Sequence, residues 1–228
     1  MKVTVQIPAK NEEGSLPSVI EKIPRDFVTE ILVVDGHSTD STMKVATALG
    51  CRVITQPGKG YGDAMIHGFK NASGDVIISM DADGSPNPKE IPKLLAKLNE
   101  GYDIVLGSRY LTGGGSEDDT LIRYIGNKSF TFITNLLHGT KMSDSLYLFC
   151  AMKKSMLDKL VFNCTDFSLC IEIPVKAHKA GFKMAEIPSF ELKRIADVSR
   201  VNAFVDGFKI LYANIKLCFE NKNEFIRK

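Results

Sequence analysis

The chain of 228 residues lacks several features that mark other classes of protein. It has no stretch of about 18 apolar residues, so we expect no membrane-spanning segment. Its formal net charge is only +2, and it has no block of lysine and arginine with interleaved aromatic residues, which argues against nucleic-acid binding. No G-x-G-x-x-G follows the first predicted strand, so a dinucleotide-dependent redox enzyme is not indicated.

Cysteine and histidine are arranged neither as a disulfide framework nor as a metal motif. The five cysteines are odd in number and include no C-x-x-C pair, and the four histidines show no metal-binding spacing. Strand-like sequence begins at Val3, so we expect no secretory signal peptide. We therefore expect a protein of the cytoplasm, with attachment to the cytoplasmic face of a membrane as the alternative.

Predicted strands alternate with predicted helices through the first 110 residues. Short apolar runs, rich in Val and Ile, predict the strands, and segments with turn residues at their starts predict the helices. This alternation predicts an α/β fold with a mostly parallel central sheet flanked by helices. The strands are expected at 3–8, 31–34, 52–55, 76–80 and 104–107, and the helices at 16–23, 41–49, 61–72 and 88–99.

After residue 110 the pattern changes. Glycine and acidic residues at 112–119 predict a mobile loop, and apolar residues on more than one face of 121–137 predict a largely buried helix. A strand at 146–151, a helix at 168–180 and an edge strand at 184–188 follow. From 201 to 219 the apolar residues form a helical stripe, which favours packing on the chain's own domain; a membrane-surface or dimer-contacting helix is the alternative.

Two carboxylates follow the predicted strand at 76–80, in the order Asp81-Ala82-Asp83-Gly84. Residues spaced i and i+2 in an extended segment point to the same side, so Asp81 and Asp83 are expected to face one small volume. The carboxyl end of a strand in an open α/β sheet is the usual place for a ligand. Two such charges repel unless a cation lies between them, and carboxylate oxygens suit Mg²⁺ or Mn²⁺. A simple polar turn is the alternative.

Seven motifs in series resemble one family. Together they are similar to the inverting family-2 glycosyltransferases with the type-A fold, and among these to polyprenyl-phosphate sugar synthases of the dolichyl-phosphate mannose or glucose type. The resemblance covers about residues 3–212. Its motifs are Ile7–Glu13, Val33–Thr42, Gly58–Gly62, Met80–Asp83, Gly107–Tyr110, Glu186–Phe190 and Arg194–Arg200.

The resemblance implies a metal-dependent, inverting transfer of a hexose from a GDP- or UDP-sugar to a polyprenyl (dolichyl or undecaprenyl) phosphate at a membrane surface. It implies one domain over 1–228, with a nucleotide-sugar-binding half at 1–110, an acceptor half at 111–200 and a C-terminal helix and tail at 201–228. Transfer to a saccharide or protein hydroxyl in cell-surface glycan synthesis, and a non-catalytic nucleotide-sugar-binding relative, are the alternatives. A homodimer or a membrane partner is also compatible with the sequence.

The donor residues follow from the matching motifs. In the family pattern Pro8, Lys10 and Glu12 line the nucleotide pocket, Asp35 accepts hydrogen bonds from the base or ribose, and Arg109 contacts a phosphate. Asp81 contacts the ribose or the metal, and Asp83 holds the Mg²⁺ or Mn²⁺ that bridges the diphosphate. The implied donor-binding residues are Pro8, Lys10, Glu12, Asp35, Asp81, Ala82, Asp83 and Arg109, of which Asp81 and Asp83 bind the metal.

On the acceptor side, Arg194, Ser199 and Arg200 match a phosphate-binding pattern, since guanidinium groups bind phosphate oxygens bidentately. Glu172 matches a family carboxylate near the acceptor. Asp144 is the candidate general base if the acceptor is a hydroxyl, and a turn cap otherwise; a phosphate acceptor is already anionic and needs no strong base. The residues implied in catalysis are Asp83, Asp144 and Arg194.

The chain departs from the family pattern in the acceptor half. Leu148-Phe149-Cys150 replaces a Gly-Phe-Arg-like segment, and Asp197 stands where a glycine is usual. These changes leave the predicted donor site intact and place the acceptor class in question.

Overall fold

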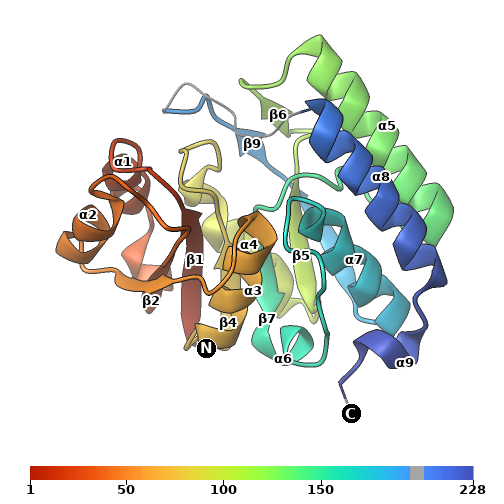
Figure 1. Ribbon diagram of the computed structural model, residues 1–228, viewed down its shortest axis with the longest axis horizontal. Helices are drawn as coiled ribbons and strands as arrows, with labels where there is room; N and C mark the ends of the chain where they lie inside the picture. The colour runs from red at the N-terminus through yellow and green to blue at the C-terminus, as the bar shows by residue number, and fades with distance from the viewer. Residues whose placement is uncertain (196–202, 228) are drawn as a thin grey trace.

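The computed structural model describes residues 1–195 and 203–227 and is built on a seven-stranded sheet with the order β3-β2-β1-β4-β7-β5-β8 (Figure 1). All neighbouring strands pair in parallel except β7, which is antiparallel to both β4 and β5. The prediction of a mostly parallel α/β sheet is confirmed. The strands are β1 (Val3–Ala9), β2 (Glu30–Asp35), β3 (Arg52–Thr55), β4 (Val76–Ser79), β5 (Ile104–Ser108), β7 (Cys150–Lys153) and β8 (Met184–Pro188).

Helices cover both faces of this sheet. Because successive strand residues point to opposite faces, Ile31 and Val33 pack with α1, α2 and α4, whereas Leu32 and Val34 pack with α3, α7 and α8. Both faces are therefore apolar, as expected for parallel strands buried between helices. The helices are α1 (Leu16–Glu21), α2 (Thr42–Ala48), α3 (Tyr61–Asn71), α4 (Ile91–Asn99), α5 (Leu121–His138), α6 (Lys154–Leu157), α7 (Leu169–Ala180), α8 (Ala203–Phe219) and α9 (Lys222–Phe225), with 3-10 turns η1 (Arg25–Phe27) and η2 (Pro88–Glu90).

The parallel register brings the predicted donor residues to one edge of the sheet. Ala9 pairs with Asp35 at the ends of β1 and β2, and the amide of Met80 donates to the carbonyl of Gln6, which places Asp81 just beyond the end of β4. The carboxyl ends of these strands thus meet, as predicted from their connections.

The segment 112–119, expected to be a mobile loop, is held in place. It contains the short strand β6 (Gly115–Ser116), which pairs in parallel with β9 (Phe190–Glu191). Its acidic side chains have partners from other segments: the amide of Lys193 donates to Glu117, and Arg123 pairs with Asp118 at 2.8 Å. The prediction of a loop is therefore wrong for residues 115 and 116, because the local composition does not show these long-range contacts.

Helix α5 has the predicted position but not the predicted burial. Only Thr131, Thr134 and His138 are buried along it, and most of its large apolar side chains face outward. The helix packs beside α8 and α7 rather than on the sheet (Figure 1), so a single narrow strip of it is covered. Within residues 1–195 and 203–227, none of the helices is long and apolar enough to cross a membrane.

Some apolar residues of α8 face the domain and others face outward. Ile210, Ala213 and Leu217 are buried against the domain, which confirms the favoured interpretation for that side of the helix.

The strand predicted at 146–151 is shorter than expected and begins later, at Cys150, as β7. The preceding residues Leu146–Phe149 are buried all the same, and the carbonyl of Phe149 accepts from the amide of Gly107.

Candidate active site

Asp81 lies directly after β4 and faces the first turn of α3. The hydroxyl of Tyr61 donates to Oδ1 of Asp81 at 2.8 Å. Burial, and then the negative charge of Asp83, raise the pKa of Asp81 to about 7, while the Tyr61 hydrogen bond and the charge of Arg194 act in the opposite direction. The two carboxylates are therefore close enough to repel each other, as their spacing predicted.

Asp83 is joined to Arg194. Its Oδ2 lies 3.2 Å from Nε of Arg194, and the same nitrogen lies 3.1 Å from Oδ2 of Asp118. The backbone is tied in the same place, since the amide of Ile195 donates to the carbonyl of Asp83 at 2.9 Å. The predicted metal-binding carboxylate and the predicted phosphate-binding guanidinium thus share one site.

The residues predicted to bind the nucleotide form a polar rim at the ends of β1 and β2. Asp35 is buried and accepts a hydrogen bond from the amide of Ser38 at 3.1 Å. Lys10 is exposed beside Gly36, where an added Cβ would lie 3.3 Å from the Cβ of Lys10. The carboxylate of Glu12 accepts from the hydroxyl of Ser15 at 2.5 Å. Pro8 is partly exposed near these residues on β1, so Pro8, Lys10, Glu12 and Asp35, four of the predicted donor residues, lie at one edge of the sheet.

Two residues of this rim have unusual backbone conformations. Asn11 has φ of 51° and His37 has φ of 60°, and these are the non-glycine residues with positive φ in the described chain. The side chain of Asn11 accepts from the amide of Thr39, and a ring nitrogen of His37 lies 3.0 Å from the carbonyl of Gly58. Left-handed backbone at such residues is retained where surrounding contacts fix it, and it is common at ligand sites.

The arrangement around Asp81 and Asp83 fits a divalent cation that is completed by substrate oxygens. Among the described residues no group of three or more His, Cys, Asp or Glu side chains stands in metal-binding geometry. Mg²⁺ commonly uses one or two carboxylates together with substrate phosphates. Asp81 and Asp83 supply two carboxylates whose repulsion a cation would relieve.

Arg109 and Asp144 bind each other inside the protein, and the amide of Leu146 donates to Oδ1 of Asp144 at 3.2 Å, which is the turn-capping contact expected if Asp144 is not a general base. Nε of Arg109 donates to Oδ2 of Asp144 at 2.7 Å, Nη2 donates to Oδ1 at 3.0 Å, and Nη1 donates to Glu191 at 3.2 Å. Arg109 is 8% exposed and Asp144 1%. The carboxylates of Asp144 and Glu191 raise the pKa of Arg109 against the effect of its burial. The pair is an internal clamp, because the bonding groups of both side chains are already used.

Glu172, expected near an acceptor, is also internal. It is 1% exposed, accepts from the amides of Asn163 and Cys164, and pairs with the buried Lys176 at 2.6 Å. It therefore positions the loop after residue 162, whose Thr165 carbonyl accepts from the amide of Asp63 in α3. Ser199, Arg200 and Asp197 lie outside the described residues.

Three residues of the site were missed by sequence analysis. Tyr61 lies inside a quoted motif, Gly58–Gly62, and its contact with Asp81 required knowing that α3 starts beside the end of β4. Asp118 and Glu191 come from β6 and β9 and their surroundings, and no local pattern indicates that they meet Arg194 and Arg109.

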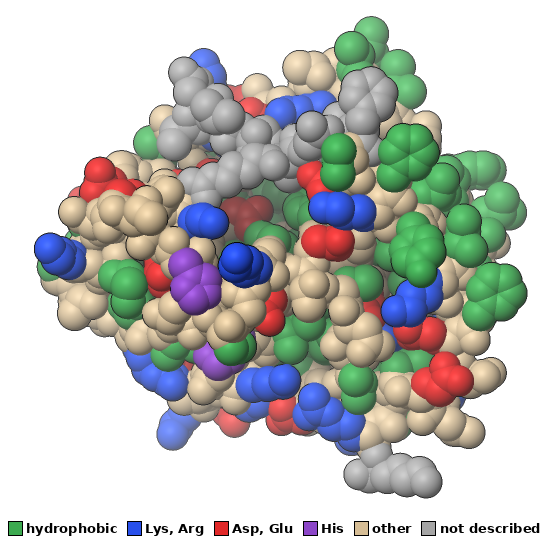
Figure 2. Space-filling view, viewed as in Figure 1, with side chains coloured by type: hydrophobic (Ala, Val, Ile, Leu, Met, Phe, Trp, Pro, Cys, Tyr) green, Lys and Arg blue, Asp and Glu red, His purple; other side chains and the backbone are tan. Residues whose placement is uncertain are grey.

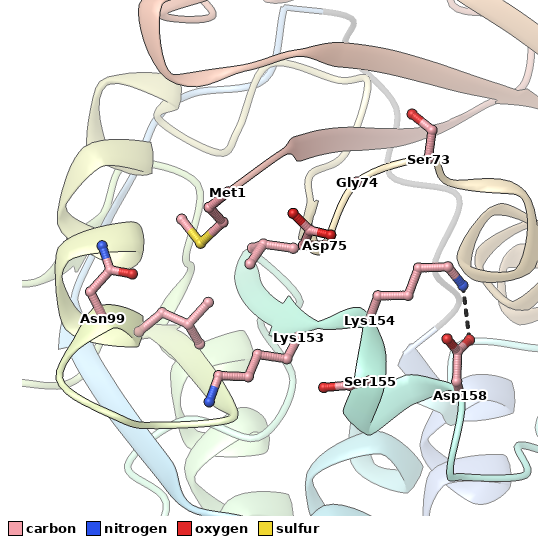
Figure 3. Close-up of a pocket in the computed structure, with 11 residues that line it drawn as sticks. Met1, Ser73, Gly74, Asp75, Asn99, Lys153, Lys154, Ser155 and Asp158 are labelled. Carbon is pink, nitrogen blue, oxygen red and sulfur yellow. Dashed lines mark hydrogen bonds and ion pairs between the residues drawn. The ribbon is translucent and has the colours of Figure 1, made fainter.

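A hollow of about 480 Å³ lies elsewhere, at the amino ends of the parallel strands (Figure 3). Met1, Asp75 and Lys154 are among the residues that line it, and none of the predicted site residues does. Its lysines are already paired, Lys153 with Asp103 and Lys154 with Asp158. It is separate from the site that contains Asp81 and Asp83.

Comparison with known proteins places this geometry in a family. The family model described as glycosyl transferase family 2 matches residues 4–161. The uncharacterized glycosyltransferase Rv0539 of Mycobacterium tuberculosis is 32% identical over 205 residues, covering 90% of this chain and 92% of that protein. The protein MJ1222 of Methanocaldococcus jannaschii is 31% identical over 220 residues, covering 92% and 90%.

Solved structures agree on the fold. Glucosyl-3-phosphoglycerate synthase from Mycobacterium tuberculosis, in complex with Mn²⁺, UDP and phosphoglyceric acid, matches with a TM-score of 0.78 at 22% identity, over 96% of this chain and 79% of that chain. A structure of the same enzyme with Mg²⁺ and UDP has a TM-score of 0.77 over 95% and 79%. The predicted type-A glycosyltransferase fold is confirmed, and the chain belongs to glycosyl transferase family 2.

Proposed function

We propose that this glycosyltransferase moves a hexose from a nucleotide-diphosphate sugar to a polyprenyl phosphate, with Mg²⁺ or Mn²⁺ held by Asp81 and Asp83. The observation that carries the proposal is the contact of Asp83 with Arg194, 3.2 Å between Oδ2 and Nε. It places a carboxylate suited to a cation–diphosphate donor beside a guanidinium suited to a phosphate acceptor.

The residues of the chain have distinct parts in this reaction. A bound divalent cation supplies Lewis-acid stabilisation of the leaving nucleoside diphosphate. Arg194 shares its charge between Asp83 and Asp118, so an acceptor phosphate competes with these carboxylates for the guanidinium. The hydroxyl of Tyr61 fixes the orientation of Asp81.

The burial and the hydrogen bonds of Asp144 favour a phosphate acceptor over a hydroxyl acceptor. Both of its oxygens accept hydrogen bonds from Arg109, and it is almost fully buried, so it has no access to a substrate hydroxyl. A phosphate oxyanion attacks the sugar without losing a proton, so transfer to a phosphate does not require Asp144 as a base. One of the solved structures named above contains phosphoglyceric acid, which carries both a phosphate and a hydroxyl, so the transfer assay includes this compound as a rival acceptor.

The test combines donor binding with a choice of acceptors. Calorimetry measures UDP and GDP binding with and without Mn²⁺, for the wild type and for Asp83→Ala. Transfer from the matching radiolabelled nucleotide sugar is then measured to a water-soluble short-chain prenyl phosphate, to 3-phosphoglycerate and to a simple saccharide. We expect metal-dependent binding of one nucleotide, its loss in Asp83→Ala, and transfer to the prenyl phosphate alone. Transfer to phosphoglycerate or to the saccharide would replace the proposed acceptor, and binding without transfer would indicate a non-catalytic relative.

A further inference from the structure

Helices α5 and α8 together present a broad apolar surface that the domain itself does not cover. The two helices pack side by side at one end of the molecule (Figure 1), and green apolar side chains gather there in the space-filling view (Figure 2). We call this surface the α5–α8 face. Its exposed large apolar residues are Leu121, Ile122, Tyr124, Ile125, Phe132, Leu136, Leu137, Val205, Phe208, Tyr212, Ile215 and Phe219.

The outward side chains of α8 have no role in the core. Ile210, Ala213 and Leu217 already pack inward, yet Phe208 and Tyr212 on the opposite side are strongly exposed, Phe208 at 73%. A helix on the surface of a globular protein normally carries polar residues on its outer face. A contiguous apolar patch of this kind on a soluble domain marks a binding surface.

The charges of the two helices indicate what binds there. Their basic residues are Arg123, Lys128, Lys209 and Lys216, whereas Asp206 is their acidic residue. Lys128, Lys209 and Lys216 are exposed, and Lys209 pairs with Asp206 at 3.2 Å, so the two helices carry an excess of basic over acidic side chains. Apolar and aromatic side chains bordered by lysine and arginine are typical of helices that lie in the interface of an anionic bilayer. A second copy would bring the same basic surface against itself, because a two-fold contact pairs identical patches.

The α5–α8 face reaches the active site through α5. Arg123, in the first turn of α5, pairs with Asp118, and Asp118 lies 3.1 Å from Nε of Arg194. Leu121 and Ile122 are in the same turn, and Ile122 is 82% exposed. Two ion pairs, Arg123 with Asp118 and Asp118 with Arg194, therefore connect the start of the α5–α8 face to the arginine that we assign to the acceptor phosphate.

From these observations we infer that the α5–α8 face docks on an anionic lipid bilayer, with α5 and α8 lying in the interface plane. This orientation lets a polyprenyl tail remain in the bilayer while its phosphate meets Arg194, a step that rests on the proposed function. Docking itself depends only on the exposed apolar and basic side chains.

The experiment is flotation of the purified full chain with two kinds of vesicle. One kind contains equal parts of phosphatidylcholine and phosphatidylglycerol, and the other contains phosphatidylcholine alone. We expect the wild type to float with the anionic vesicles, and less so at high salt. Phe132→Ser/Phe208→Ser should reduce binding at least about tenfold, because two aromatic side chains no longer bury apolar surface in the bilayer. Lys209→Glu/Lys216→Glu should reduce binding to the anionic vesicles.

Phe27→Ser is the matched control, since Phe27 is an exposed phenylalanine in η1, between α1 and β2, and it should leave flotation unchanged. Metal-dependent nucleotide binding by each variant reports that the fold is intact. Absence of wild-type flotation, equal flotation of the Phe132/Phe208 variant, or a wild-type dimer in light scattering that this variant dissociates would each overturn the inference. Transfer to the short-chain acceptor without flotation would reject docking alone, and flotation without transfer to any acceptor would reject the proposed function alone.

Discussion

Arg194 is held between two carboxylates, with its Nε 3.2 Å from Asp83 and 3.1 Å from Asp118. These residues come from the loop after β4, the segment after β9 and the segment after β6, so the halves predicted to bind the donor and the acceptor meet at one guanidinium. A ligand that binds either carboxylate changes the environment of Arg194.

Replacing Arg194 should affect the acceptor more than the donor. We expect Arg194→Ala to raise the KM for a prenyl phosphate about 10- to 100-fold, since a charge-assisted phosphate contact is lost. The Kd for nucleotide with Mn²⁺ should stay the same or fall, because Asp83 loses a competing cation. Steady-state kinetics and calorimetry measure the two effects. Lys193→Ala is the neighbouring control, and equal losses in donor and acceptor binding would refute the division of roles.

Replacing Asp144 should reduce stability without removing a base. Asp144→Asn breaks a buried pair with Arg109, and we expect the free energy of unfolding to fall by about 3 kcal/mol. Urea denaturation measures this change. The pH profile of kcat/KM for the folded variant should keep its shape, because Asp144 transfers no proton. A loss of about 100-fold or more at unchanged stability would instead identify Asp144 as a general base.

Asp81 should make the metal-free protein less stable as the pH rises. Its pKa is raised from 3.8 to about 7, so between these values the folded state binds more protons than the unfolded state. The contribution of this group to the free energy of unfolding therefore decreases with rising pH through that window and is constant above it. We expect Asp81→Asn to flatten the profile, by about 2 kcal/mol across the window after allowance for partial solvent screening. Urea denaturation in EDTA at several pH values tests this, and parallel profiles of wild type and variant would contradict it.

Gly62 should tolerate no side chain. A Cβ there would lie 2.3 Å from the carbonyl oxygen of Cys164 and 2.7 Å from that of Asp166, and neither atom is the end of a flexible side chain. We expect Gly62→Ala to lower the free energy of unfolding by about 1–3 kcal/mol and to weaken nucleotide binding, because α3 and Tyr61 would shift. Gly126→Ala in α5 is the control, since a Cβ there meets nothing within 4 Å. It should stabilise the helix by about 0.5–1 kcal/mol. Thermal unfolding of both variants gives the comparison.

The sequence predicted best what depends on neighbouring residues. The apolar run before Asp81 forms β4 as expected, and the charge of Asp83 raises the pKa of Asp81, although residues 82 and 83 form a turn and not the extended segment that the spacing argument assumed. Contacts between residues that are far apart in the sequence could not be predicted from any local pattern. Arg109 contacts Asp144 and Glu191, which are 35 and 82 residues away, so two predicted site residues form a buried ion pair that no local pattern indicated.

Burial of α5 could not be predicted for a related reason. Its periodicity shows that apolar residues occur on several faces. This pattern is typical both of a helix buried in a core and of a helix that neighbouring elements cover only in part. The difference depends on what packs around it, and here α8 and α7 cover a single strip.

The reversed strand β7 has a consequence for how this chain can be divided. It lies between β4 and β5 and pairs with one edge of each, although it follows β5 in the sequence by a long segment that contains β6 and α5. A fragment that ends after β5 would lose the middle of its own sheet and leave β5 unpaired. We therefore expect the nucleotide-binding half to be a region of one cooperative unit, so that truncations and chimaeras that cut between the halves should yield aggregated protein rather than a working donor module.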